Sequence, residues 1–146
     1  MFKSCEVIIT RVLAVRQPWA SLIVEGLKTI EVRSRITNIR DKIAIYASSS
    51  KPDTIEEYYG EYNFYNLPRG FIIGTVEIVG CTEFDLITYS GKELLSKASL
   101  LPLYKITTDS AYWKLSNPVK FAQPIPYKPP KGAVVWSNFE LPEEAK

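Results

Sequence analysis

The first apolar positions of the chain fall into two different spacings. Residues 12–15 form a short continuous apolar run, which predicts a buried strand. From Trp19 to Gly26 the apolar and small side chains recur at i, i+3, i+4 and i+7, which predicts a helix with one apolar stripe. Pro18 suits the first turn of such a helix, and Gly26 suits its C-terminal stop.

Residues 29–33 alternate between apolar and polar side chains, which predicts a strand. Ile30 and Val32 face one way and hold the strand to the body of the fold, while Glu31 and Arg33 face the other way. Lys28 stands at the mouth of this strand, just after the helix stop. Three charged side chains therefore gather at one helix–strand junction.

The remainder of the chain predicts more short strands and two more short helices. The strands are expected over residues 42–48, 71–79, 121–125 and 133–136. Asn117-Pro118 marks a turn, and capping-box patterns at Asp53 and Ser90 each begin a helix, the second with Leu94 and Leu95 facing inward. Strands and helices do not alternate regularly. We therefore expect an α+β fold: a small mixed β-barrel of about six strands with short helices outside it, in a single domain over residues 1–146.

Composition places the chain among soluble globular proteins. Of its 146 residues, 46% are apolar and 23% are charged, which is ordinary for a domain that buries its own core. No apolar run approaches the roughly 18 residues that a membrane-spanning helix needs, and the first residues lack the apolar region of a signal peptide. We expect an intracellular, cytoplasmic protein with no membrane partner.

The chain has no histidine, and its two cysteines are Cys5 and Cys81. This composition excludes the usual Ser-His-Asp and Cys-His nucleophile systems and argues against a zinc site. Neither a Walker loop nor a Gly-x-Gly-x-x-Gly motif is present. We expect no metal and no cofactor, so any acid–base chemistry must use Lys, Glu, Asp, Tyr or Cys side chains.

The net charge of +2 is unevenly distributed. Residues 11–42 hold seven basic and three acidic side chains, whereas residues 53–93 hold eight acidic and two basic ones. From residue 94 onward the chain is basic again, with seven lysines against four acids. Such a distribution permits one basic face that suits a polyanion. An uneven scatter without function is the alternative.

Lys28, Glu31 and Arg33 support two interpretations. Glu31 and Arg33 lie about 7 Å apart on one face of an extended strand, so with Lys28 they can line a mixed-charge pocket. There the cations can bind phosphate or a base edge, and the carboxylate can orient them, accept a proton or contact an exocyclic amine. The alternative is a ladder of surface ion pairs that contributes under about 1 kcal/mol.

Aromatic and hydroxyl side chains add further candidates. Trp19 follows Pro18 and can line the pocket and stack on a base, although tryptophans in a small domain usually belong to the core. Trp136, in the apolar run at residues 133–136, is better explained as a core residue. Ser48, at the end of a predicted strand, is a candidate hydroxyl donor, although a serine run usually marks a loop.

These residues stand in an order that resembles the ASCH domain (activating signal cointegrator homology) over nearly the whole chain. The most specific part is Gly26-x-Lys28-x-x-Glu31-x-Arg33. The other matching segments are Gln17-Pro18-Trp19-Ala20-Ser21-Leu22, Ile45-x-Ala47-Ser48, residues 72–77, Trp113 with Asn117-Pro118, and residues 124–126 before Gly132 and Trp136. The resemblance implies a PUA-like β-barrel, related to domains that bind RNA.

For the site, the resemblance implies a cleft beside the barrel with Gly26 at its floor. It points to Lys28, Glu31, Arg33 and Ser48 as cleft residues, with Trp19 nearby. Some small relatives hydrolyse the N4-acetyl group of modified cytidine, but they place threonine where this chain has Glu31. Ribonuclease activity is also proposed within the family. Tyr46 stands where relatives often have histidine, which removes one acid–base group.

Two hypotheses of function follow. The first is an RNA-binding module whose cleft receives one nucleotide, modified or not. The alternative is a metal-independent amidohydrolase acting on N4-acetylcytidine-type nucleosides, with Lys28 and Glu31 as its catalytic candidates, or a ribonuclease that also uses Tyr46. A module that binds only other proteins has no positive support in the sequence.

Overall fold

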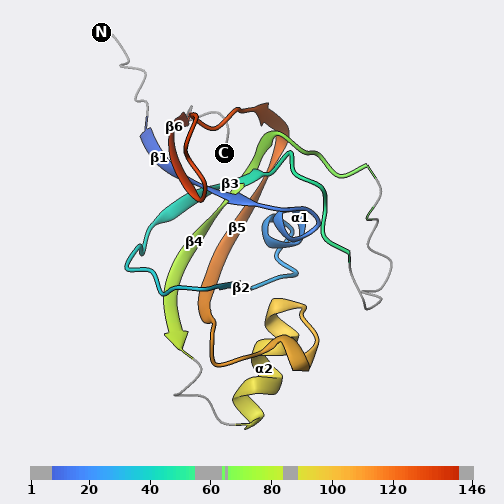
Figure 1. Cartoon of the computed structure of the whole chain (residues 1–146). Helices are drawn as coiled ribbons and strands as arrows, with labels where there is room; N and C mark the ends of the chain where they lie inside the picture. The colour runs from blue at the N-terminus through green and yellow to red at the C-terminus, as the bar shows by residue number, and fades with distance from the viewer. Residues whose placement is uncertain (1–7, 55–63, 65, 84–88, 142–146) are drawn as a thin grey trace, which may run out of the picture.

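The computed structural model describes residues 8–54, 64, 66–83 and 89–141. Within these ranges the chain forms six strands, two α-helices and one short 3₁₀ helix (Figure 1). In chain order they are β1 (Ile8–Val15), α1 (Trp19–Val24), β2 (Ile30–Arg33), β3 (Lys42–Ala47), β4 (Phe71–Glu83), α2 (Tyr89–Ser99), η2 (Leu103–Lys105), β5 (Ala111–Pro126) and β6 (Trp136–Leu141).

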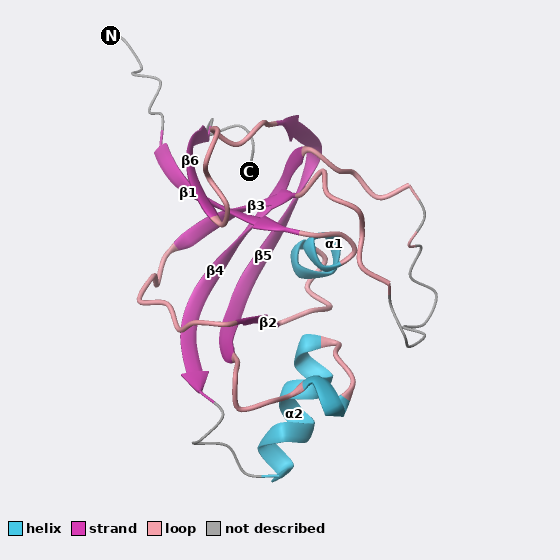
Figure 2. Cartoon of the chain, viewed as in Figure 1, coloured by secondary structure: helices cyan, strands magenta, loops and turns pink. Residues whose placement is uncertain are grey.

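All six strands belong to one mixed sheet, in the order β2-β5-β4-β3-β1-β6. Only the β1–β3 pair is parallel, and the other described pairs are antiparallel. The long strands β4 and β5 form the centre, and β1 crosses them steeply, so the sheet bends strongly (Figure 2). The expected α+β fold of about six strands with short flanking helices is confirmed. The sheet does not close into a complete barrel, because its edge strands β2 and β6 do not pair with each other.

The last third of the chain differs from the sequence prediction. Asn117 and Pro118 do not end a strand but lie inside β5, which runs through 16 residues. Between Thr75 and Glu77 of β4, the partners on β5 step from Val119 to Ser116, so β5 has one extra residue there, which forms a bulge. A bulge tolerates both a proline, which lacks an N–H, and the positive φ of 53° at Asn117.

The final strand also begins later than predicted. β6 starts at Trp136, and Val134 in the preceding segment is 84% exposed rather than buried. Trp136 packs against the main core and stacks on Trp113 of β5, with ring centroids 6.0 Å apart. The prediction that Trp136 is a core residue is therefore correct in kind, although the side chain is only partly buried.

The main core lies between the bent sheet and α1. The side chains of α1 from Ala20 to Val24 are all buried, which places this short helix inside the curve of the sheet (Figure 2). The helix approaches β4 closely at Gly74. A Cβ there would lie 2.2 Å from the Val119 carbonyl oxygen and 2.8 Å from a methyl group of Val24. Glycine is therefore required where the helix, β4 and β5 meet.

A second, smaller core joins α2 and η2 to the sheet. Ile30 of β2, Leu95 of α2, Ile106 and Tyr112 are buried together, and Val32 packs against them. Ile30 and Val32 thus anchor β2 to α2 and not to the main core of the sheet. Leu95 faces inward as predicted, but Leu94 is largely exposed, so the prediction for that residue is wrong.

The helix predicted from Asp53 lies almost wholly outside the described residues. Residues 51–54 are described and have no regular secondary structure. Neither helix in the described part of the chain has the length and apolar character needed to span a bilayer.

Candidate functional site

The C-terminus of α1 sets the direction of the chain into the site. Gly26 has a φ of +80°, and its N–H donates to the Ile23 carbonyl while the Leu27 N–H reaches back to Leu22. This pair of bonds is a Schellman motif, which favours glycine at the left-handed position. The Lys28 N–H also donates to the Leu22 carbonyl. The end of α1 therefore fixes the position of the Lys28 backbone against the last turn of the helix.

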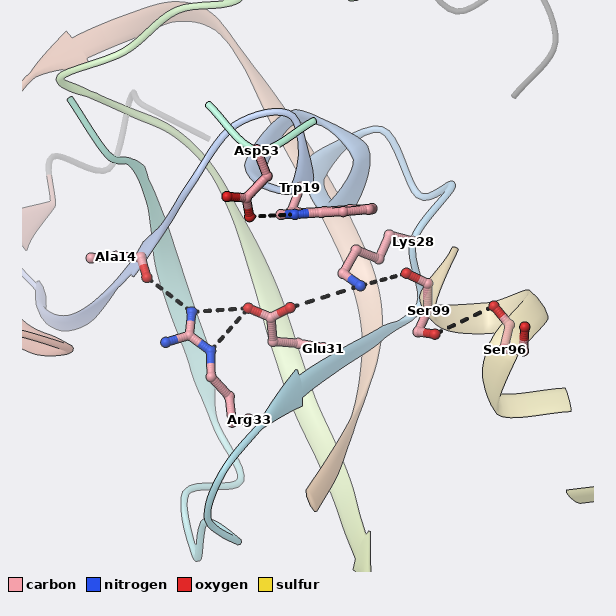
Figure 3. Close-up of polar contacts among 8 residues, drawn as sticks. All are labelled: Ala14, Trp19, Lys28, Glu31, Arg33, Asp53, Ser96 and Ser99. Atoms are coloured by element: carbon pink, nitrogen blue, oxygen red, sulfur yellow. Dashed lines mark hydrogen bonds and ion pairs between the residues drawn. The ribbon is translucent and has the colours of Figure 1, made fainter. Parts of the chain in front are cut away.

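The Lys28 side chain is buried beneath Trp19 and against the end of α2 (Figure 3). Only 2% of it is exposed. Its Nζ donates a hydrogen bond of 2.5 Å to the Ser99 carbonyl and lies 4.9 Å from the centroid of the Trp19 ring. Burial lowers the pKa of Lys28 from 10.5 to about 8; the Glu31 carboxylate opposes this shift, and the Arg33 guanidinium adds to it.

Glu31 lies between the two cations. Its Oε1 is 3.8 Å from Lys28 Nζ, and its Oε2 accepts hydrogen bonds from Nε and Nη2 of Arg33 at 3.0 and 2.9 Å. The carboxylate is almost fully buried, with 8% of the side chain exposed. A carboxylate in such a position needs compensating partners, and Arg33 and Lys28 supply them.

Arg33 also bridges the open side of the sheet. Its Nη2 donates to the Ala14 carbonyl of β1 at 2.9 Å. The Ala14 N–H, on the same edge of β1, donates to the Val135 carbonyl. The β1–β6 pairing ends at Leu13. Just beyond it, the Arg33 guanidinium of β2 supplies the hydrogen-bond donor for the open edge of β1. The Arg33 Cζ also lies 5.9 Å from the centroid of the Trp113 ring.

Asp53 positions Trp19 and Arg16 on the side of the site away from Arg33. Its Oδ2 accepts a 2.9 Å hydrogen bond from Trp19 Nε1 (Figure 3). Its Oδ1 lies 3.4 Å from Nη1 of Arg16. Trp19 is thereby fixed with Asp53 at its indole nitrogen and the Lys28 ammonium against its ring. The indole is half-buried, so part of its surface faces the cavity described next.

These side chains surround a cavity of about 520 Å³, here called the main cavity. It is large enough for a small ligand such as a nucleotide. Its lining consists of Ala14, Val15, Arg16, Trp19, Lys28, Glu31, Val32, Arg33, Ser48, Ser50, Asp53, Leu101, Val134 and Val135. Trp19, Lys28, Glu31, Arg33 and Ser48, the site residues predicted from the sequence, all line it.

Two details of the predicted site differ in the structure. Lys28 lies at the buried floor of the main cavity and not at its mouth, because Ser99 and Trp19 cover it. Gly26 does not line the cavity. Its role is the turn after α1, where the position of a Cβ would lie 3.3 Å from Pro118.

Tyr46 does not reach the main cavity. Both faces of the central strand β3 are buried, and Tyr46 packs on the face opposite to Ile45, among Phe121 and its neighbours. Its ring meets Tyr127 edge to face at 5.5 Å. The structure therefore does not bring Tyr46 together with Lys28 and Glu31, the other acid–base candidates for a ribonuclease.

Sequence analysis did not identify several residues of the cavity. The sequence pattern explains Asp53 as a helix cap and places Val134 and Val135 in a predicted strand. Arg16, directly before the predicted helix, contributes to the sequence analysis only through its charge. The signal for Asp53, a carboxylate three residues after the last serine of the run, is weak, and only the fold shows that it lies within reach of Trp19.

Comparisons with known proteins agree with this architecture. The chain superposes on the ASCH protein of Zymomonas mobilis with a TM-score of 0.58 at 18% identity, over 93% of this chain and 90% of that one. A point mutant of the same bacterial protein gives a TM-score of 0.57 at 17% identity, with the same coverage of both chains. At this level of identity the likeness establishes the fold.

Sequence relatives include activating signal cointegrator 1. The human protein is 34% identical over 80 residues, and the mouse protein is 31% identical over 80 residues. Each match covers 47% of this chain but only 14% of the cointegrator, so the similarity concerns a small part of a much longer protein. The family model of the ASCH domain matches residues 13–130, which include Trp19, Ser48 and the charged residues from Lys28 to Arg33. The chain belongs to the ASCH domain family.

Proposed function

We propose that the protein binds RNA and receives one nucleotide, modified or unmodified, in the main cavity. The observation that carries this proposal is a fixed guanidinium with unused donors at the wall of a nucleotide-sized cavity. Nε and Nη2 of Arg33 are engaged by Glu31 and Ala14, whereas Nη1 makes no hydrogen bond to the described residues. With 23% of the Arg33 side chain exposed, Nη1 can donate two N–H bonds to a phosphate.

The other residues of the main cavity suit the remaining parts of a nucleotide. The half-buried indole of Trp19 offers a surface for stacking a base, an interaction worth about 1–3 kcal/mol. Oε1 of Glu31 can accept a hydrogen bond from an exocyclic amine, and Ser48 offers a hydroxyl. Lys28, at the floor, carries a positive charge when it is protonated. An anionic ligand would favour this charged form and so raise the pKa of Lys28 from about 8. In this arrangement Arg33 binds the phosphate on one side of the main cavity, and Trp19 stacks on the base on another.

Val134→Glu tests this proposal with little risk to the fold. Val134 lines the main cavity, yet it is 84% exposed, so the substitution adds a negative charge to the wall without disturbing the core. Val79→Glu is the matched control, because Val79 is also exposed but does not line the cavity. Binding of a fluorescent single-stranded RNA panel is measured by anisotropy at several salt concentrations.

Affinity should fall steeply with salt, as phosphate contacts release counterions. Val134→Glu should weaken binding by about fivefold or more through like-charge repulsion, while Val79→Glu should behave like the wild type. Equal affinities for the wild type and both variants would contradict the placement of RNA in the main cavity. Absence of binding by the wild type to every RNA tested would contradict the function itself.

A second candidate function is hydrolysis of the N4-acetyl group of a modified cytidine. The specific observation in its favour is the pKa of about 8 at Lys28, beside a carboxylate 3.8 Å away. A neutral Lys28 amine can take a proton from water as the water adds to the acetyl carbonyl. It then returns the proton to N4 as the C–N bond breaks, giving acetate and cytidine. Glu31 and Arg33 would orient the amine.

Incubation with N4-acetylcytidine, followed by chromatography for cytidine, tests this activity. The rate should rise as the pH passes about 8, because Lys28 loses its proton there. Lys28→Met should abolish turnover, while Lys42→Met, at an exposed lysine of β3, should not. If no cytidine forms at any pH while RNA still binds, the protein is a binding module and not this hydrolase.

A further inference from the structure

A second hollow continues from the main cavity beyond Arg33. It measures about 300 Å³ and is here called the side pocket. Arg33 and Val135 line both hollows, so the two share one wall. The side pocket also includes Arg35, Ile36 and the two tryptophans of β5 and β6, and every residue that lines it lies in the described part of the chain.

The walls of the side pocket are rigid where they are aromatic. Trp113 is buried and donates from Nε1 to the Arg35 carbonyl at 2.8 Å, which fixes the backbone just after β2. Trp136 stacks on Trp113 with an interplanar angle of 10°. The partly buried Trp136 and the exposed Ile36 then present an apolar surface of the kind on which a base packs.

Charge distinguishes the side pocket from the other hollow beside the main cavity. The side pocket has two arginines, Arg33 and Arg35, and no acidic residue in its lining. On the opposite side, a hollow of about 780 Å³ shares only Asp53 with the main cavity, and its lining among the described residues contains one acid, Asp53, and one base, Arg69. A polyanion leaving the main cavity is therefore attracted more strongly at the side pocket, where two arginines face no acid in the lining, than at the Asp53 side.

We propose that the side pocket receives the nucleotide adjacent to the one in the main cavity. The ligand is then single-stranded RNA of at least two nucleotides. Arg33, on the shared wall, contacts the phosphate that links them. Arg35, two residues further along and exposed, contacts the next phosphate, and the second base packs on Trp136 and Ile36. This inference rests on the proposed RNA binding and adds the direction in which the strand leaves the main cavity.

The test compares ligands that differ by one nucleotide. The probes are the four nucleoside 5′-monophosphates and the four 5′-phosphorylated homodinucleotides, titrated into the full chain by calorimetry. The best dinucleotide should bind about five to 150 times more tightly than its mononucleotide, which is the factor that one stacked base supplies. Arg35→Ala should weaken dinucleotide binding by about fivefold or more through the lost phosphate contact, without changing the affinity for the mononucleotide.

Arg11→Ala is the matched control, because Arg11 is an exposed arginine of β1 that lines neither hollow. It should leave both affinities unchanged. Equal binding of mono- and dinucleotides overturns the second subsite but leaves RNA binding in the main cavity intact. Equal loss of both ligands in Arg35→Ala also overturns it. Failure of all eight ligands and of the longer RNA panel contradicts the proposed function instead, so the two failures are distinguishable.

Discussion

The Lys28 ammonium lies 3.8 Å from the nearer carboxylate oxygen of Glu31, and both side chains are almost fully buried. Each charge has a further partner: the Ser99 carbonyl at the end of α2 accepts from Lys28, and Arg33 on the same strand donates to Glu31. The pair is therefore a component of the fold as well as a wall of the main cavity. This dual role gives it measurable effects on stability.

Glu31→Gln should destabilise the protein by about 3 kcal/mol, because it leaves two cations without their shared carboxylate in a buried site. Urea unfolding measures the change. Glu25→Gln is the control: Glu25 pairs with Lys120 at the surface and should contribute under about 1 kcal/mol. Similar small losses in both variants would show that the Glu31 carboxylate does not hold the site together.

The stability of the wild type should rise with pH above about 8. Burial lowers the pKa of Lys28 from 10.5 to about 8, so the folded state releases this proton at a lower pH than the unfolded chain. Between these values the unfolded chain binds more protons, and the free energy of unfolding increases by on the order of 3 kcal/mol across the whole window. Below about pH 8 both states hold the proton, and this contribution stays constant.

Urea unfolding from about pH 8 to about pH 9.5 measures this dependence. The upper limit matters because burial raises the pKa of the Tyr112 hydroxyl above its ordinary 10.0, which opposes the rise at higher pH. Lys28→Met should remove most of the slope, whereas Lys42→Met should preserve it. A wild-type protein whose stability is flat over this interval would contradict the lowered pKa.

Gly74→Ala should destabilise the protein by about 3 kcal/mol through overpacking. The new methyl group would meet the Val119 carbonyl oxygen at 2.2 Å, and backbone cannot move aside cheaply. Gly80→Ala is the control on the same strand, because its nearest neighbour is the flexible side chain of Lys114 at 3.4 Å. Thermal unfolding of the two variants should differ clearly, and equal midpoints would contradict the close approach of α1 to β4 and β5.

Arg33→Lys should lower stability and RNA affinity together, although it keeps the charge. Lysine cannot reproduce the planar fork that joins Glu31 to the Ala14 carbonyl, and each lost charged hydrogen bond costs about 1.5–3 kcal/mol. Amide exchange at Ala14 should accelerate, because its N–H lies on the edge that Arg33 completes. Arg11→Lys should change none of these quantities. Unchanged exchange at Ala14 in Arg33→Lys would show that the edge does not depend on the guanidinium.

Local pattern predicted much of the candidate site. Strand alternation places Glu31 and Arg33 on one face whatever the tertiary context, and a glycine at a helix end favours the left-handed turn that Gly26 makes. The order of these residues with Trp19 and Ser48 indicated the family. The strand face and the helix ending each depend on neighbours within a few positions along the chain.

Non-local contacts decided the remainder. The burial of Lys28 comes from Ser99, which lies 71 residues further along the chain, so no local pattern reveals it. Asn117-Pro118 is read locally as a turn, but pairing with β4 on both sides makes it a bulge. Tyr46 is directed away from the cavity because β3 is a central strand with two buried faces.

The sequence by itself thus determined which side chains face together on β2 and where α1 ends, because backbone geometry sets both. Only the tertiary structure decided that Lys28 is a buried floor, that Asp53 fixes Trp19, and that Arg33 spans the open edge to Ala14. The physical reason is that burial, and the pKa shift and ion pairing that follow from it, depend on distant segments being packed together.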